Sequence, residues 1–267
     1  MSIWQAAILG LLQGLTEFLP VSSSGHLVLM RAYWEMIPQD LLFEVTVHLA
    51  TLLAVVAYYR HDILAIFKGA ITGTPSKCAG MSTRRWVGLI MLGSIPAAVV
   101  GLLLRAQLEA TFSDGAGAGM RLMATGALLF STAPIAATRR SMSAATAFLI
   151  GIAQAVAILP GISRSGATIA TGIWGGIERE QAARYSFLLS LPAIGGAFLL
   201  QVLDVAEHSV ALDAQRLWPL IVGFVVALVS GYFAVSLLIR ALIRNKFALF
   251  GIWCWIVGIW ALKYFGR

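Results

Sequence analysis

The sequence predicts an all-α polytopic membrane protein with an inverted-topology repeat. Of its 267 residues, 59% are hydrophobic and 12% are charged, which is about half the charged fraction of a typical soluble domain. The mean hydropathy is +0.86. Six segments have or approach the ~20 apolar residues that a helix needs to cross a bilayer. They are residues 42–59, 87–104, 120–137, 185–203, 217–238 and 247–264. We expect one compact bundle, a single membrane domain over residues 1–267.

The net charge of +7 does not indicate a nucleic-acid-binding protein. Basic side chains gather in short stretches between apolar segments, as is typical of cytoplasmic loops in membrane proteins. These stretches are residues 60–86, 139–140 and 240–246, which we assign to the cytoplasmic side. The acidic stretch 204–216 and the mixed stretch 105–119 are then expected on the outer side.

Two further apolar regions are interrupted by polar residues. Pro20 and a serine run break residues 3–36, and Pro160 and a Ser-Arg-Ser run break residues 144–177. Proline inside a helix removes a hydrogen bond and clashes with the preceding turn, so a straight helix is not expected through either site. The loop charges place both ends of residues 144–177 on the cytoplasmic side. If residues 3–36 are also a hairpin, the N-terminus lies outside and the two hairpins enter from opposite faces. Each region is therefore predicted to be a re-entrant helical hairpin, and the two broken apices meet near the midplane.

The two halves of the chain form an internal repeat, residues 1–140 and residues 141–267. Each half consists of one hairpin and three spanning helices, and three crossings predict that the second half is inverted. Inverted repeats with broken helices recur in membrane proteins that bind polar ligands. Five residues of the first hairpin recur at the same spacing in the second: Gly10, Gln13, Ser22, Ser24 and Gly25 correspond to Gly151, Gln154, Ser163, Ser165 and Gly166.

Glycines and cysteines in the apolar segments are interpreted as structural. A weaker similarity between the two halves aligns Gly93 and Gly101 with Gly223 and Gly231. Small residues allow helices to pack closely, so these glycines are expected at contacts between helices. Cys78 and Cys254 have no metal-site spacing, so both are interpreted as structural thiols.

A glutamine and a carboxylate share one face of the first hairpin helix. Gln13 and Glu17 are four residues apart, and an oxygen pair suits a hard divalent cation that keeps waters and bridges to phosphate. Both are therefore predicted metal ligands, and Glu17 is also a predicted catalytic residue. The alternative is that Glu17 pairs with His26 or Arg164 as a purely structural contact.

The serine run after Pro20 opens the second helix of the first hairpin. Backbone N–H groups at a helix N-terminus form an anion site, and serine hydroxyls add donors. His26 follows the run, where it is placed to deprotonate a serine or a water. The alternative is an ordinary N-cap with a histidine whose hydrogen bonds are satisfied. The sequence predicts substrate binding by Ser22, Ser24 and Gly25, and catalysis by Ser23 and His26.

The second apex carries a guanidinium group. Arg164 matches the geometry of phosphate and keeps its charge, and it can stabilise charge on a transferring phosphoryl group. The alternative is an arginine that neutralises Glu17, and both interpretations can hold when no substrate is bound. We predict that Arg164 is catalytic and that substrate binding involves Ser163, Ser165, Gly166 and Thr168.

Together these groups indicate phosphoryl chemistry on a lipid-linked phosphate, because the site lies within the membrane. The main alternative is a transporter or flippase for a polyprenyl phosphate, which would use the same apices only to bind. A hydrolase also needs a base and a metal site. Glu44 and His48, four residues apart, are either a second layer of the site or a plain helix-face pair.

The residues of both apices resemble those of the undecaprenyl pyrophosphate phosphatase family, also known as the bacitracin-resistance phosphatase. The first family motif corresponds to Gln13-Gly-Leu-Thr-Glu17 and continues through Ser23 to His26. The second reads Pro160-Gly-Ile-Ser-Arg-Ser-Gly-Ala-Thr168. The chain carries His48 and Ala50 where the family pattern has Gln and Gly.

The resemblance implies hydrolysis of undecaprenyl pyrophosphate to undecaprenyl phosphate and inorganic phosphate. That reaction recycles the lipid carrier of peptidoglycan synthesis and gives bacitracin resistance. The resemblance further implies Mg²⁺ or Ca²⁺ as cofactor, a bacterial inner-membrane location and a site that opens to the periplasm. Ser23 and His26 are then alternative nucleophiles, and Arg164 binds the pyrophosphate. The oligomeric state is open, with a homodimer as one expectation.

Overall fold

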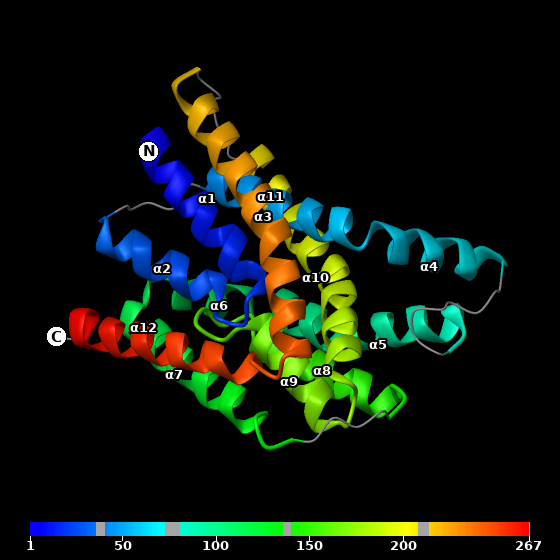
Figure 1. Ribbon diagram of the computed structural model, residues 1–267. Coiled ribbons are helices and arrows are strands. Elements are labelled where there is room, and N and C mark those ends of the chain that lie inside the picture. The colour runs from blue at the N-terminus through cyan, green and yellow to red at the C-terminus, as the bar shows by residue number, and fades with distance from the viewer. Residues whose placement is uncertain (36–40, 73–80, 136–139, 208–213, 267) are drawn as a thin grey trace.

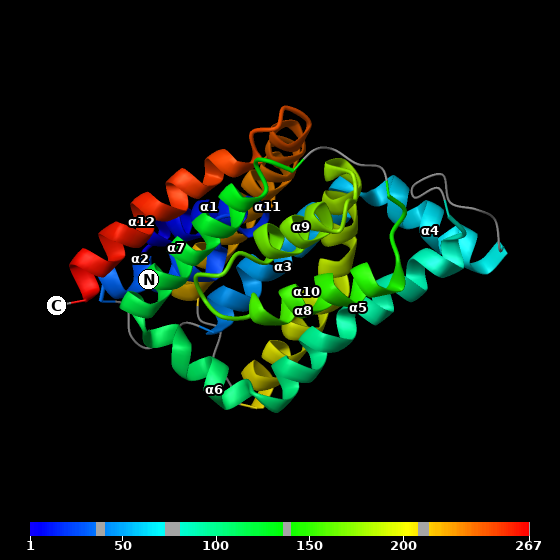
Figure 2. The same cartoon turned by 90° about the horizontal axis from the view of Figure 1, so that it is seen from below.

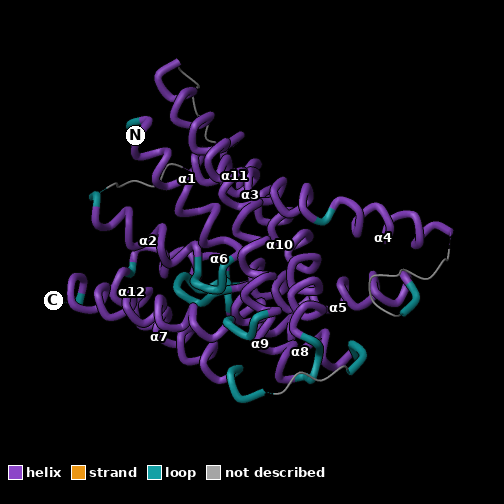
Figure 3. The backbone as a smooth tube through the Cα atoms, viewed as in Figure 1, coloured by secondary structure: helices purple, strands orange, loops and turns teal. Residues whose placement is uncertain are grey.

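The computed structural model describes residues 1–35, 41–72, 81–135, 140–207 and 214–266, and within them it contains α-helices and no strand (Figures 1 and 3). The helices are α1 (Ile3–Phe18), α2 (Ser23–Tyr33), α3 (Leu41–Tyr58), α4 (Arg60–Thr72), α5 (Thr83–Leu103), α6 (Arg105–Ala110), α7 (Gly115–Ser131), α8 (Ala144–Val156), α9 (Arg164–Trp174), α10 (Arg179–Glu207), α11 (Ala214–Ile243) and α12 (Phe250–Phe265). Cys78 and parts of the predicted loops 60–86, 139–140 and 204–216 lie outside the described residues.

Each predicted spanning segment coincides with a helix. Four stretches of the described chain are long and apolar enough to cross a membrane: Thr83–Leu103 of α5, Arg179–Leu200 of α10, Leu217–Ile243 of α11, and Phe247–Phe265, which is α12 with the 3₁₀ turn that precedes it. Helix α3 is long and apolar enough to cross a membrane only when it is joined to α4 across a bend of 73°. Helix α7 has 17 residues and is not among the candidate spans. The described part of the chain is therefore a multi-pass, all-helical membrane protein with four or five candidate spans, where the sequence predicted six.

Helix α4 corrects the expectation that residues 60–86 form only a loop. Its charged residues suggested a connection, but Ile63 and Ile66 pack against the core while Leu64 and Phe67 are exposed. A helix with charges and exposed apolar side chains suits a membrane interface. Likewise α6 and a short 3₁₀ turn (Thr111–Ser113) occupy part of the predicted loop 105–119.

Both predicted breaks are present. Helix α1 ends at Phe18, and Leu19 has extended backbone angles (φ −64°, ψ 145°), because a proline disfavours the helical conformation of the residue before it. Helix α8 ends at Val156, four residues before Pro160. In each case a second helix follows and packs against the first, so α1–α2 and α8–α9 are the two hairpins.

Part of the helix packing is reciprocal between the two halves. Helix α1 of the first hairpin packs against α11, and α8 of the second hairpin packs against α5. Helices α3 and α10 pack against each other, as do α7 and α12 (Figure 2). Exchange of the two halves maps these pairs onto one another, but other pairs are not exchanged: α9 packs against α10, with no comparable packing of α2 against α3 among the described residues. The repeat itself and its inversion across a membrane stay predictions.

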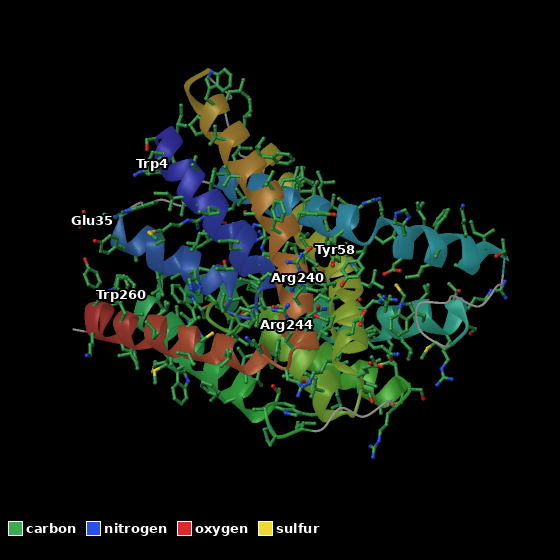
Figure 4. All side chains as sticks on the ribbon, in the orientation of Figure 1. Trp4, Glu35, Tyr58, Arg240, Arg244 and Trp260 are labelled. Carbon is green, nitrogen blue, oxygen red and sulfur yellow. The ribbon has the colours of Figure 1, made fainter. Side chains whose placement is uncertain are left out.

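Both chain ends lie on the same side of the bundle (Figure 1). The two termini are on the left of the molecule and α4 extends to the right (Figure 1). Trp4 and Trp260 lie on the side of the termini, whereas Arg240 and Arg244 lie toward the far end of α11 (Figure 4). Trp4 is 73% exposed, and exposed tryptophans are typical of membrane–water interfaces.

Glycines bring the hairpins against the spanning helices, as predicted. A Cβ on Gly10 would lie 3.0 Å from the Cα of Gly223, and a Cβ on Gly151 would lie 3.0 Å from the Cα of Gly93. Gly101 has no such close neighbour, since its Cβ would lie 3.8 Å from the nearest atom, Cδ1 of Ile158. Close packing is therefore confirmed for Gly93 and Gly223 and is not required at Gly101.

Replacing Gly93 with alanine is expected to destabilise the protein by about 1–3 kcal/mol, the usual cost of overpacking a core. The new Cβ would lie 2.6 Å from the hydroxyl of buried Tyr185 and 3.1 Å from the carbonyl oxygen of Ala147. Gly101→Ala on the same helix is the matched control. Thermal unfolding in detergent measures both variants, and equal melting temperatures would contradict tight packing at Gly93.

Candidate active site

The apices of the two hairpins are in direct contact. The backbone N–H of Gly161 donates to Oγ of Ser22 (3.1 Å), and the hydroxyl of Ser165 donates to the carbonyl oxygen of Leu19 (3.2 Å). A Cβ on Gly25 would lie 2.8 Å from the Cα of Gly161. The backbones of the two apices therefore approach so closely that only glycine fits at position 25. Residues of both halves therefore build one polar cluster.

Glu17 is the centre of this cluster. Its Oε1 accepts a hydrogen bond from Nη2 of Arg164 at 2.5 Å. Its Oε2 accepts from the hydroxyl of Ser23 at 2.6 Å and from Nε2 of Gln13 at 3.1 Å. The side chain of Glu17 is 8% exposed and that of Arg164 is 15% exposed, so their charges are paired away from water. The predicted grouping of these four residues is present.

Two buried polar atoms of the cluster have no protein partner among the described residues. They are Nη1 of Arg164 and Oε1 of Gln13. An unpaired buried donor or acceptor is costly, which indicates that something else satisfies them. The donor on Arg164 suits a phosphate oxygen, and the acceptor on Gln13 suits a cation or a water. Gln154, the repeat counterpart of Gln13, also has both amide atoms buried without a partner.

The residues present fit a divalent cation that is completed by its substrate. No group of three or more His, Cys, Asp and Glu that could hold a metal occurs in the part of the chain that is described. Glu17 and Gln13 supply a carboxylate and an amide oxygen, which is the ligand set of a hard cation that keeps water or takes phosphate oxygens.

Two helix N-termini face the cluster. Ser23 is the first residue of α2 and Arg164 is the first residue of α9. Ser22 and Ser163 cap these helices, accepting the backbone N–H of Gly25 (3.3 Å) and of Gly166 (3.1 Å). The positive ends of both helix dipoles thus lie beside Glu17 and Arg164, and such ends favour anions.

Most of the other predicted substrate-binding hydroxyls have protein partners. Oγ of Ser163 lies 3.2 Å from Oγ of Ser165, and Oγ of Ser24 lies 3.4 Å from that of Ser22. Thr168 lies 2.6 Å from the Ser186 hydroxyl and donates to the carbonyl oxygen of Arg164. These contacts build the apices, and direct contact with substrate stays a prediction.

Two residues of α7 that the sequence analysis did not select hold the second apex. Nε of Arg121 donates to the carbonyl oxygen of Pro160 at 2.6 Å. The hydroxyl of Thr125 donates to the carbonyl oxygen of Gly161 at 2.8 Å and accepts the backbone N–H of Ser163 at 3.1 Å. A charged residue inside an apolar segment was the available signal for Arg121.

The imidazole of His26 is not hydrogen-bonded to Ser23 or Glu17. Its Nδ1 lies 2.8 Å from the carbonyl oxygen of Ser22, and its Nε2 accepts from Nε1 of Trp253 at 2.9 Å. Both ring nitrogens therefore have partners, and His26 is 6% exposed. The base within hydrogen-bond distance of the Ser23 hydroxyl is Glu17.

His48 lies closer to the cluster than the sequence indicated. It interacts electrostatically with Glu17, Arg31 and Arg164. Its Nδ1 lies 2.8 Å from the carbonyl oxygen of Glu44, while the carboxylate of Glu44 pairs with Arg31. The two side chains are therefore not a simple helix-face pair, because His48 extends the charged neighbourhood of Glu17 onto α3.

The buried thiol of Cys254 donates to the carbonyl oxygen of Pro20 at 3.7 Å. It therefore supports the first apex, in agreement with the interpretation of Cys254 as a structural thiol.

Comparison with known proteins places the chain in one family. The family model of bacitracin resistance protein BacA matches residues 6–260. The undecaprenyl-diphosphatase of Desulforapulum autotrophicum is 40% identical over 271 residues, covering 97% of each chain. That of Carboxydothermus hydrogenoformans is 40% identical and covers 97% of this chain and 96% of its own. That of Christiangramia forsetii is 38% identical and covers 99% and 98%. The chain that brings Glu17, Ser23 and Arg164 together thus belongs to the bacitracin resistance protein BacA family.

Proposed function

We propose that the protein hydrolyses undecaprenyl pyrophosphate to undecaprenyl phosphate and inorganic phosphate. The observation that carries this proposal is the contact of one carboxylate with both a serine hydroxyl and an arginine. Glu17 accepts from Ser23 at 2.6 Å and from Arg164 at 2.5 Å. A nucleophile, its base and an electrophilic cation in mutual contact are the parts that acyl- or phosphoryl-transfer sites require.

In the proposed mechanism Glu17 removes the proton of the Ser23 hydroxyl. The serine oxygen forms a bond to the terminal phosphorus, the bridging P–O bond breaks, and undecaprenyl phosphate leaves. Water then hydrolyses the phosphoserine to release inorganic phosphate. A hydroxyl bonded to a base is the geometry of an activated nucleophile. This mechanism favours Ser23 over His26 as nucleophile, because the ring nitrogens of His26 are bonded elsewhere.

Arg164 binds the phosphates and stabilises the charge of the transferring group. Its Nη1 has no hydrogen-bond partner among the described residues, so it is available to a phosphate oxygen while Nη2 remains on Glu17. The N-termini of α2 and α9 add backbone donors. A bound Mg²⁺ or Ca²⁺ would neutralise phosphate charge, and we propose that Glu17 and Gln13 hold it.

We further propose that the protein lies in the bacterial inner membrane with its site open to the periplasm. There it recycles the lipid carrier of peptidoglycan synthesis, and thereby lowers sensitivity to bacitracin. The basic loops assigned to the cytoplasm support this orientation. A homodimer is the oligomeric state that we propose to test, by light scattering of the purified protein.

The test is phosphate release from a polyprenyl pyrophosphate by the purified protein in detergent or liposomes. We expect release in the presence of Mg²⁺ or Ca²⁺ and at least a tenfold loss after chelation by EDTA, reversed when the cation is restored. A transporter would need the phosphate-binding groups, but it would not need a base that activates a nucleophile. Movement of a polyprenyl phosphate across liposomes with no phosphate release would overturn the proposal in favour of transport.

A further inference from the structure

We propose that Trp253 of α12 is a positioning residue for the reaction. Its indole N–H holds His26, and through His26 it holds Ser22 at the junction of the two apices. This inference rests on the proposed phosphatase function for its kinetic test. It assigns a role to a residue outside both polar motifs, 227 positions from its partner.

The contact between Trp253 and His26 selects one form of the imidazole. An indole nitrogen is a donor only, so Nε2 of His26, at 2.9 Å, must be the unprotonated nitrogen. The proton is then on Nδ1, which donates to the carbonyl oxygen of Ser22 at 2.8 Å. The two rings are parallel within 3°. Trp253 thus fixes both the tautomer and the orientation of His26.

Ser22 needs such support because its backbone is strained. Its φ of +67° is in the left-handed region, which non-glycine residues adopt only when their surroundings enforce it. The carbonyl oxygen of Ser22 accepts from the ring and from the backbone N–H of His26. Its Oγ accepts from Gly25 and from Gly161 of the other apex.

Ser22 directly precedes Ser23, whose hydroxyl meets Glu17 at 2.6 Å. A relaxed Ser22 would move Ser23 and loosen the bond to Gly161 at the same time. The hydrogen bonds from Trp253 to His26 and from His26 to Ser22 therefore position the residue next to the proposed nucleophile, Ser23. Small displacements of a reacting group lower the rate much more than they lower binding.

The hydrogen bond from Trp253 is what distinguishes the two nitrogens of the ring. With Trp253 in place, Nε2 accepts the indole N–H. Without it, Nε2 loses that donor inside a site that is 6% exposed, so neither the tautomer nor the orientation of the imidazole is fixed any longer.

The test compares Trp253→Phe with Trp255→Phe. Both residues are on α12 and both donate a hydrogen bond, but Trp255 donates to the carbonyl oxygen of Met123 (3.0 Å) and not to His26. We expect Trp253→Phe to lower kcat about tenfold, the effect of one lost hydrogen bond, with KM changed less than twofold. Trp255→Phe should leave both kcat and KM unchanged.

A second measurement does not depend on activity. The ¹⁵N spectrum of histidine-labelled protein should show His26 protonated on Nδ1, and Trp253→Phe should remove that signature while Trp255→Phe keeps it. The inference is overturned if Trp253→Phe keeps the kcat and the His26 spectrum of the unmodified protein. Equal kinetic losses in the two variants would overturn it as well, as a general effect on α12. If the unmodified protein releases no phosphate, the proposed function fails, and the spectrum still decides whether Trp253 fixes His26.

Discussion

Replacing Arg164 with alanine is expected to lower kcat/KM for phosphate release by about 10³-fold or more, the usual contribution of an arginine that stabilises a transferring phosphoryl group. Within the described part of the chain its Nη1 has no hydrogen-bond partner, and Arg164 is the first residue of α9. Its loss therefore removes the cation from the point where negative charge develops. Rates of phosphate release by the purified protein measure the effect.

Arg164→Lys separates charge from geometry in the same assay. A lysine keeps the charge but lacks the planar fork that binds Glu17 and a phosphate at once, so we expect it to regain only a small part of the lost rate. Thermal unfolding shows whether each variant is folded. A folded Arg164→Ala protein with unchanged kcat/KM would contradict the proposed role.

Replacing Glu17 with glutamine is expected to affect both activity and stability. The rate should fall by about 10²- to 10⁴-fold, the usual contribution of a general base. The free energy of unfolding should fall by about 3 kcal/mol, because removal of one partner leaves a buried charge uncompensated. Arg164 is that charge, with its side chain 15% exposed. Steady-state kinetics and thermal unfolding in detergent measure the two effects.

The double variant Glu17→Gln/Arg164→Gln distinguishes the two roles of the ion pair. It has no buried charge at the site, so we expect it to regain most of the stability lost by Glu17→Gln while it remains inactive. A double variant less stable than Glu17→Gln would show that the buried pair is not the source of the stability loss. Full activity of Glu17→Gln would exclude Glu17 as the base.

The parts of the structure that local sequence determines were predictable. Pro20 and Pro160 end helices through steric effects on their immediate neighbours, so both breaks were evident from the sequence. The repeat also located the paired apices, because serine and glycine recur at the same spacing. Helix α4 was missed because its charges outweighed its apolar face, which becomes evident only once Ile63 packs on the core.

Long-range partners could not be predicted from the sequence. Glu17 had two candidate partners, His26 and Arg164, and only the packing of the hairpins shows that Arg164 is the one. His26 turned away from the cluster because Trp253, on a helix with no polar motif, supplies a donor at 2.9 Å. Thr125 supports the second apex through backbone atoms, and a threonine in an apolar helix gives no signal of such a role.

The contact between Ser22 and Gly161 sets a sequence of events during synthesis of the chain. These residues are 139 positions apart, and at about 5–20 residues per second a ribosome needs roughly 7–28 s to make the intervening chain. During that interval Glu17 is already synthesised but Arg164 does not yet exist. Until the second hairpin is made, the Glu17 carboxylate cannot pair with Arg164, and the Ser22 hydroxyl cannot accept the N–H of Gly161. A chain that stops before Gly161 and Arg164 would leave the first hairpin without either of these contacts.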